Sequence, residues 1–191
     1  MFAEKQQKPV RTYAPIVVAP MTGNFDFETY SEAGYYFDEA TQRWRGLQQG
    51  KPGIAAVGAA VYAEHPSTIM LCVSWDLGTG NKLWVNPRLT PEIAALIIRQ
   101  NRLELLEATD FGPSPIELIA HVTSGGLMSA YNSMFEYLIW NRVCCRTLGW
   151  PPLPLGQLRC AQSQAKAFGL PSTLEKAAIV LNLDQQKGLG N

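Results

Sequence analysis

Two acidic residues that alternate with aromatic residues are the part of the sequence best suited to chemistry. Asp26 and Glu28 lie on either side of Phe27, and Phe25 precedes them. A strand with a period of two places both carboxylates on one face and both rings on the other. Carboxylates spaced in this way can direct hard oxygen ligands for divalent metal ions into one site. A half-buried strand with its acidic face in water has the same alternation, so the spacing alone fits both interpretations.

A third acid lies just after a short predicted strand, where the chain enters a predicted helix. Asn132 is a common type of N-cap, and Glu136 falls in the first turn of the helix, where the helix dipole favours negative charge. Both residues therefore have a structural explanation as well as a chemical one.

The elements that must position these acids include several strands and helices. Residues 16–30 and 68–75 predict strands, residues 82–85 complete a hairpin with the second of them, and residues 127–131 predict a short strand. Helices are predicted from apolar spacing and capping residues at 91–102, 133–148, 158–168 and 172–183, the last with a Ser172–Glu175 capping box.

Three segments have a weaker pattern. Residues 31–53 mix aromatic residues with Gly, Gln and Arg and predict an irregular connection. Residues 54–62 fit a strand or a buried loop, and residues 115–122 fit a helix or a strand. With strands early and helices late, the sequence predicts an α/β fold with a mixed sheet flanked by helices.

Length and composition bound the domain organisation. The chain of 191 residues is long enough for one domain with a proper core. Residues 1–14 are polar without periodicity and predict a flexible lead-in, which leaves residues 15–191 as that domain. No apolar run fits a signal peptide or a membrane span. The cysteines form no CxxC pair, which favours reduced thiols in a cytoplasmic protein: Cys72, Cys144, Cys145 and Cys160.

Charge and the remaining motifs exclude several classes of site. Sixteen basic and sixteen acidic residues cancel, so any contact with nucleic acid must be local. His65 and His121 are the only histidines and lie in unrelated contexts, so a nucleophile paired with a histidine has little support. The glycines at 78–80 and 188–190 lack the lysine and spacing of a phosphate loop.

Two segments resemble known exonuclease motifs. Residues 25–31 (FDFETYS) resemble the first exonuclease motif of the DEDD superfamily, and residues 132–136 (NSMFE) resemble its second. Further segments are similar to the exonuclease region of phage-encoded family A DNA polymerases: 62–66, 74–78, 139–141, 149–154, 157–160 and 170–175. The likeness covers nearly all of residues 23–187, and two motifs in the right order are far more specific than either alone.

The resemblance implies an RNase H-like domain with metal-dependent 3′–5′ exonuclease activity, which removes nucleotides from DNA 3′ ends as in polymerase proofreading. It implies that Asp26, Glu28 and Glu136 are the catalytic ligands of two divalent metal ions, Mg²⁺ or Mn²⁺. Bound in this way, the ions would activate a water and stabilise the leaving 3′ oxygen.

The resemblance also implies how substrate binds. Thr29 would contact the terminal nucleotide, Asn132 would orient the substrate, and Phe135 would lie beside the terminal base. A single-stranded DNA 3′ end suits such a site, because an unpaired base can stack on an aromatic ring. The expected partners are that DNA end and, in an intact relative, a polymerase domain; no membrane partner is expected. The expected location is the cytoplasm of a bacterial host that carries the phage or prophage gene.

Two departures from the family pattern change the expectation. Tyr131 stands where the family usually has His before the Asn of the second motif. The third motif, a Tyr or His four residues before an Asp, is expected after a segment like residues 185–191, where the given sequence ends. Asp184 has Val180 four residues before it and is a poor substitute.

The expectation from these departures is a domain truncated at its C-terminus that lacks the third motif. Metal binding and hydrolysis should then be weaker. The alternative is a catalytically incomplete domain that binds DNA or a partner protein without cleavage. A free-standing structural domain with no role on DNA is the third interpretation.

Overall fold

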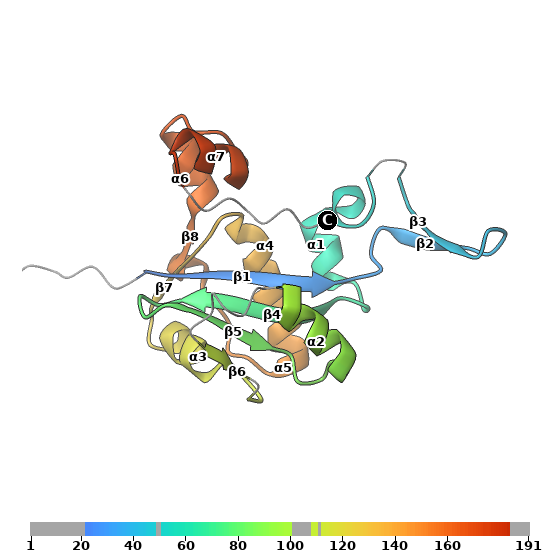
Figure 1. Cartoon of the computed structure of the whole chain (residues 1–191), viewed down its shortest axis with the longest axis horizontal. Helices are drawn as coiled ribbons and strands as arrows, with labels where there is room; N and C mark the ends of the chain where they lie inside the picture. Colours follow the sequence, from blue (N-terminus) through green and yellow to red (C-terminus); the bar gives the residue numbers. More distant parts are fainter. Residues whose placement is uncertain (1–21, 49–50, 101–107, 111, 184–191) are drawn as a thin grey trace, which may run out of the picture.

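The protein forms a mixed six-stranded sheet with helices on both faces. The computed structural model describes residues 22–48, 51–100, 108–110 and 112–183. Strands β1 (Thr22–Tyr30), β4 (Ile69–Asp76) and β5 (Asn81–Val85) pair in an antiparallel manner in chain order. The sheet order is β6-β5-β4-β1-β7-β8 (Figure 1), with β6 (Ala108–Asp110) parallel to β5, and β7 (Leu127–Ala130) and β8 (Leu158–Cys160) on the β1 side.

The strand directions place several carboxyl ends together. The β1–β7 and β7–β8 pairs are parallel, whereas β4 is antiparallel to both of its neighbours, β1 and β5. The chain therefore leaves β1, β7 and β8 at the same edge of the sheet, which is where parallel strands bring successive connections together. The predicted α/β fold with a mixed sheet flanked by helices is confirmed.

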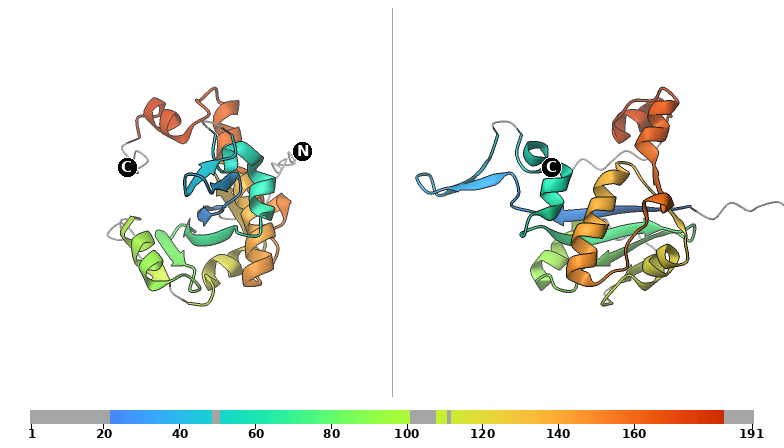
Figure 2. Two further views of the ribbon diagram at one scale, coloured as in Figure 1. Left: turned by 90° about the vertical axis from the view of Figure 1, so that its right-hand side faces the viewer. Right: turned by 180° about the vertical axis from the view of Figure 1, so that it is seen from behind.

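The helices divide between the two faces of the sheet (Figure 2). Helices α1 (Ile54–Glu64), α3 (Ile116–Thr123), α4 (Ser133–Leu138) and α5 (Cys145–Leu148) belong to the face that carries the larger core. Helix α2 (Pro91–Gln100) covers the other face, where Ile97 packs with Cys72, Leu83 and Val85. Helices α6 (Ala161–Ala167) and α7 (Leu174–Val180) follow β8.

The alternation in β1 has the predicted outcome. Phe25 and Phe27 are each 4% exposed in the larger core, whereas Asp26 and Glu28 are exposed on the opposite face. Glu28 pairs across the strand with Cys72, so the acids share their face with the α2 cluster. The strand shifts register between Glu28 and Thr29, a bulge that re-aims the residues after the acids.

A cluster of aromatic rings fixes β1 against the segment that follows α4. Trp140 lies 6.1 Å from Phe25, 6.2 Å from Phe27 and 4.9 Å from Trp150, measured between ring centroids. Trp140 belongs to a π-helical segment, Ile139–Cys144, inside the continuous helix predicted at 133–148. Its indole N–H donates to the carbonyl oxygen of Pro151 at 2.7 Å, so the polar atom of this buried ring is satisfied.

Several elements differ from the sequence predictions. Residues 31–53 contain a hairpin of β2 (Tyr35–Asp38) and β3 (Arg43–Gly46), and not only an irregular connection. Residues 54–62 lie in α1 and form neither a strand nor a buried loop, because alanine-rich sequence favours helix; Gly58, at φ 80°, kinks this helix.

The C-terminal half also requires corrections. The ambiguous segment 115–122 is helix α3. The segment predicted as helix from residue 158 begins instead with strand β8, which follows the turn η3 (Leu155–Gln157) and completes the sheet edge beside β7. Helix α7 is capped by Thr173, whose Oγ1 accepts from the Lys176 N–H at 3.4 Å, and not by Ser172.

Several predicted segments extend beyond the described residues, among them the helix predicted at 91–102, whose residues 101 and 102 lie outside. The lead-in at 1–14 and the first part of the strand predicted at 16–30 lie outside them. Asp184 and residues 185–191 do so as well. In the described part of the chain, no helix has both the length and the apolar character needed to cross a membrane.

We predict that Trp140→Ala lowers the free energy of unfolding by about 3–5 kcal/mol, because it removes the ring that joins both phenylalanines to Trp150 and leaves a cavity. Urea denaturation followed by circular dichroism measures the change. Trp44→Ala is the matched control: Trp44 is 55% exposed and its loss should change stability by less than about 1 kcal/mol. Equal losses in both variants would contradict the role of the cluster.

Candidate functional site

The chain brings the two predicted motifs together at one edge of the sheet. Asn24 of β1 pairs with Ser129 of β7, and β7 ends at Ala130. Helix α4 starts three residues later, so Glu136, in its first turn, lies shortly after the carboxyl end of β7, the strand beside β1. Burial is the main cause of the raised pKa of Glu136, and the negative charge of Asp26 contributes to it.

Glu136 is the most unusual of the predicted site residues. It is only 4% exposed, and its Oε2 has no hydrogen-bond partner among the described residues. Burial first, and then the charges of Asp26 and Cys160, raise the pKa of its carboxyl from 4.5 to about 7. Two indole nitrogens, Trp75 Nε1 and Trp150 Nε1, are also buried without partners in the described part, but Glu136 is the acid among these residues. A nearby cation strongly stabilises a buried carboxylate that has one oxygen without a donor.

Glu28 lies on the same face of β1 as Asp26 and acts on different neighbours. Burial first, and then the charges of Glu28 and Asp26, raise the pKa of the Cys72 thiol to about 12. Burial also raises the pKa of Tyr62, where the Glu28 charge adds to the effect and a hydrogen bond with Thr29 opposes it. The charge of Glu28 therefore acts on both Cys72 of β4 and Tyr62 of α1.

Thr29 and Phe135 are joined through a residue that the sequence analysis did not select. Thr29 Oγ1 and the Tyr62 hydroxyl share a hydrogen bond of 3.1 Å. The Tyr62 ring lies 6.0 Å from the Phe135 ring, between centroids, and Tyr62 is 8% exposed. Tyr62 thus connects β1, α1 and α4 at the predicted substrate site. Its place in segment 62–66, which shares the exonuclease likeness, was the signal that could have identified it.

Asn132 occupies the expected position at the start of α4 but not the expected local role. It is the N-cap residue, and its carbonyl oxygen accepts from the Phe135 N–H at 2.9 Å. Its side chain makes no capping hydrogen bond to the helix. The side-chain amide is therefore not committed to the helix terminus, which is compatible with the predicted role in orienting substrate.

Cys160 is a second residue near the site, after Tyr62, that the sequence did not single out. From the sequence, an ordinary reduced thiol is expected at this position. Burial opposes the shift, but hydrogen bonds from Ser163 and Ser133 lower the pKa of the Cys160 thiol to about 7. The thiol also lies 3.5 Å from the Tyr131 carbonyl oxygen, and its charge contributes to the raised pKa of Glu136. This proximity arises because β8 is parallel to β7, a pairing that the sequence pattern did not predict.

The residues present fit a divalent cation in chemistry but not as a complete ligand cluster. Three carboxylates supply hard oxygen donors, and the unpartnered Glu136 oxygen next to the charge of Asp26 marks a place short of positive charge. Among the described residues, no three His, Cys, Asp or Glu side chains are already arranged to hold a metal ion. Binding would therefore require a cation to draw these carboxylates together or substrate oxygens to complete the shell.

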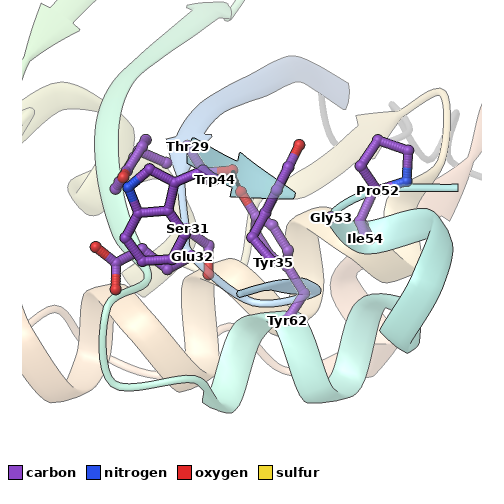
Figure 3. Close-up of a pocket in the computed structure, with 10 residues that line it drawn as sticks. Thr29, Ser31, Glu32, Tyr35, Trp44, Pro52, Gly53, Ile54 and Tyr62 are labelled. Carbon is purple, nitrogen blue, oxygen red and sulfur yellow. Dashed lines mark hydrogen bonds between the residues drawn. The ribbon is translucent and has the colours of Figure 1, made fainter. Parts of the chain in front are cut away.

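A cavity of about 500 Å³ opens between the end of β1, the β2–β3 hairpin and the start of α1. Thr29 and Tyr62 contribute to its wall and so link it to the carboxylate site. Figure 3 shows Tyr35 and Trp44, from the hairpin, and Glu32 among the residues that line this cavity.

Comparisons of the chain with protein-family models, with curated proteins and with solved structures found no match. The assignment of the two exonuclease motifs therefore depends on the residues and on the geometry around them.

We predict that the stability of the wild type falls as pH rises from about 4.5 to 7 relative to Glu136→Gln. In this window the folded state, with its raised pKa, binds more protons than the unfolded state, so the free energy of unfolding decreases with pH. At about pH 8, without divalent metal, Glu136→Gln should be more stable than the wild type by roughly 2–3 kcal/mol, and near pH 4.5 the gain should vanish.

Urea denaturation at both pH values measures this difference. Glu64→Gln is the control, because Glu64 is exposed and its 3.7 Å ion pair with Arg142 lies at the surface. A gain in Glu136→Gln that is the same at both pH values would show that the ionised carboxylate is not the cause.

Proposed function

We propose that the chain is an RNase H-like exonuclease domain that uses divalent metal ions to remove nucleotides from single-stranded DNA 3′ ends, as in DNA polymerase proofreading. The observation that carries this proposal is the buried Glu136 carboxylate with an unpartnered oxygen, held within the field of Asp26 by the junction of β1, β7 and α4. Such an arrangement is unfavourable for a structural domain and favourable for a cation site.

The order of the strands supports the fold named in this proposal. RNase H-like sheets begin with three antiparallel strands in chain order and add later strands beside the first and parallel to it. Strands β1, β4 and β5, followed by β7 and β8, have this order. Strand β6 and the β2–β3 hairpin are additions to it. Because one fold hosts many functions, the proposed activity depends on the site and not on this order.

Asp26, Glu28 and Glu136 would hold the metal ions, Mg²⁺ or Mn²⁺. When bound, these ions supply an activated water and stabilise the leaving 3′ oxygen. The chain's own part is to fix the carboxylates on rigid elements: β1 is paired on both sides, and α4 continues into the buried π-helical segment. The raised pKa of Glu136 also means that without metal this carboxyl is partly protonated near neutral pH.

The substrate would enter next to Thr29, Asn132 and Phe135. Thr29 is positioned by its hydrogen bond with Tyr62, and Phe135 lies against the same tyrosine ring. An aromatic ring beside the terminal base favours an unpaired end, which can unstack and enter. The zero net charge of the chain agrees with binding through a local site and not through a general electrostatic field. A polymerase domain, in the cytoplasm of a bacterial host, is the further partner proposed.

A second candidate function is binding of a DNA end without cleavage. It is favoured by the absence, in the described part of the chain, of three side chains already arranged for a metal ion. Asp184 lies outside the described residues.

We predict that Asp26→Ala and Glu28→Ala each reduce shortening of a 5′-labelled single-stranded oligonucleotide by at least about 100-fold, because each removes a ligand of the ions that activate water. The assay follows the ladder of products with Mg²⁺ or Mn²⁺ on a denaturing gel. Circular dichroism checks that both variants remain folded, and Glu64→Ala controls for loss of an exposed acid.

The outcomes separate the candidates. Wild-type activity that both variants retain would contradict the catalytic roles. No cleavage by the folded wild type, combined with binding of the same oligonucleotide, would favour the non-cleaving domain.

A further inference from the structure

The β2–β3 hairpin presents an aromatic stripe that leads into the cavity beside Thr29. Tyr35 and Phe37 are two residues apart on β2, so they share one face, and Phe37 pairs with Trp44 of β3. The Phe37 and Trp44 rings meet edge to face, with centroids 5.6 Å apart. The three side chains are 40%, 44% and 55% exposed, a surface that water does not favour. Figure 1 shows this hairpin projecting beyond the end of β1.

The opposite face of the hairpin has a different chemistry. Tyr36 pairs with Arg45, and the Arg45 guanidinium is bound to Asp38 at 2.6 Å. This cation is therefore already paired with an acid on its own hairpin. The stripe itself consists of flat rings, whereas Arg43 and Arg45 lie on the other face of the hairpin, so a ligand would bind the stripe by stacking.

The cavity at the base of the stripe is built by specific local contacts. Ser31 Oγ accepts from the Ala33 N–H at 3.0 Å, and Ser67 Oγ accepts from the Glu32 N–H at 2.8 Å. The Leu47 N–H donates to the Gly34 carbonyl oxygen at 2.7 Å and closes the base of the hairpin. Gly34, at φ 80°, approaches the Gly53 backbone so closely that a Cβ would collide with it.

The lining favours a nucleobase over other ligands. Tyr35 and Trp44 provide ring faces, and Thr29, Ser31 and Glu32 provide polar groups at the cavity. The Glu32 carboxylate would repel a phosphate, whereas the N–H groups of a base edge can donate to it. The volume of about 500 Å³ lies within the range of small-molecule sites and holds a base.

We propose that this cavity and stripe form a stacking subsite for the unpaired base of the nucleotide that precedes the 3′-terminal one. The inference rests on the proposed function, because it takes the terminal nucleotide to lie at Thr29 and Phe135. Thr29 lines the cavity and directly follows Glu28, so the next nucleotide of the same strand reaches Tyr35 and Trp44. The hairpin thereby selects single-stranded ends, since a paired base cannot enter the cavity.

Binding in EDTA tests the subsite without any cleavage. Trp44 is suited to this because the other four tryptophans, at positions 75, 84, 140 and 150, are at most 4% exposed. Quenching of tryptophan fluorescence by a short single-stranded oligonucleotide reports on Trp44, and anisotropy of a 5′-fluorescein label gives the dissociation constant for each variant. We predict that Trp44→Ala and Tyr35→Ala each weaken binding at least about 5-fold, which corresponds to loss of stacking on one base.

Tyr36→Ala is the matched control, because Tyr36 is an exposed tyrosine of the same hairpin on its other face. It should leave binding unchanged. An oligonucleotide with an abasic position next to its 3′ end should bind the wild type as weakly as the intact oligonucleotide binds Trp44→Ala. Trp44→Ala should not weaken the binding of this abasic oligonucleotide any further.

Equal effects of Trp44→Ala and Tyr36→Ala, or full binding of the abasic oligonucleotide, would overturn the subsite. Self-association of the chain through the hairpin in sedimentation, with DNA binding unaffected by Trp44→Ala, would assign the stripe to protein contact and also overturn it. Failure of the proposed function is distinguished by the cleavage assay with Asp26→Ala, because the EDTA experiment measures base stacking independently of hydrolysis.

Discussion

The site depends first on the packing of Phe25 and Phe27 against the indoles of Trp140 and Trp150. Burial of these rings sets which face of β1 points into the core, and a period of two then forces Asp26 and Glu28 onto the other face. The same rings join β1 to the π-helical continuation of α4, the element that carries Glu136. One apolar contact therefore fixes the relative position of acids that are far apart in the sequence, and the exposed face remains open to substrate.

The second constraint is electrostatic. Glu136 is carried into the protein by α4, where burial and the charge of Asp26 disfavour its ionised form. The folded state thus contains an ionisable carboxyl in an unfavourable environment, and a bound cation would stabilise its charged form. Electrostatically unfavourable groups of this kind are typical of functional sites. A hydrogen bond and a ring contact join Thr29, Tyr62 and Phe135, the residue that precedes Glu136. The aromatic hairpin lines the same cavity as Thr29 and Tyr62.

Much of the sheet could be predicted from sequence because its signals are local. The alternation in β1, the apolar run of β4, the turn before β5 and the Thr90–Pro91 start of α2 each depend on a few adjacent residues. The β2–β3 hairpin lacks such a signal: its turn uses Asp38 as a local acceptor and places Gln42, not Gly or Asn, at φ 52°. Tyr62 and Cys160 reach the site through α1–α4 contact and β7–β8 pairing, which no local pattern contains. The sequence motifs selected the three candidate acids, whereas the burial of Glu136 becomes visible only in the folded structure.

The central claim is that the carboxylates of β1 and α4 form one cation site. A crystal structure of the full chain grown at about pH 8 with Mn²⁺, with anomalous scattering recorded at the manganese edge, tests it most directly. The account predicts an anomalous peak bound by Asp26 and Glu136, with the Glu136 oxygen that has no partner in the described structure among its ligands. Manganese bound only elsewhere, or Glu136 left without a cation at saturating Mn²⁺, would contradict it.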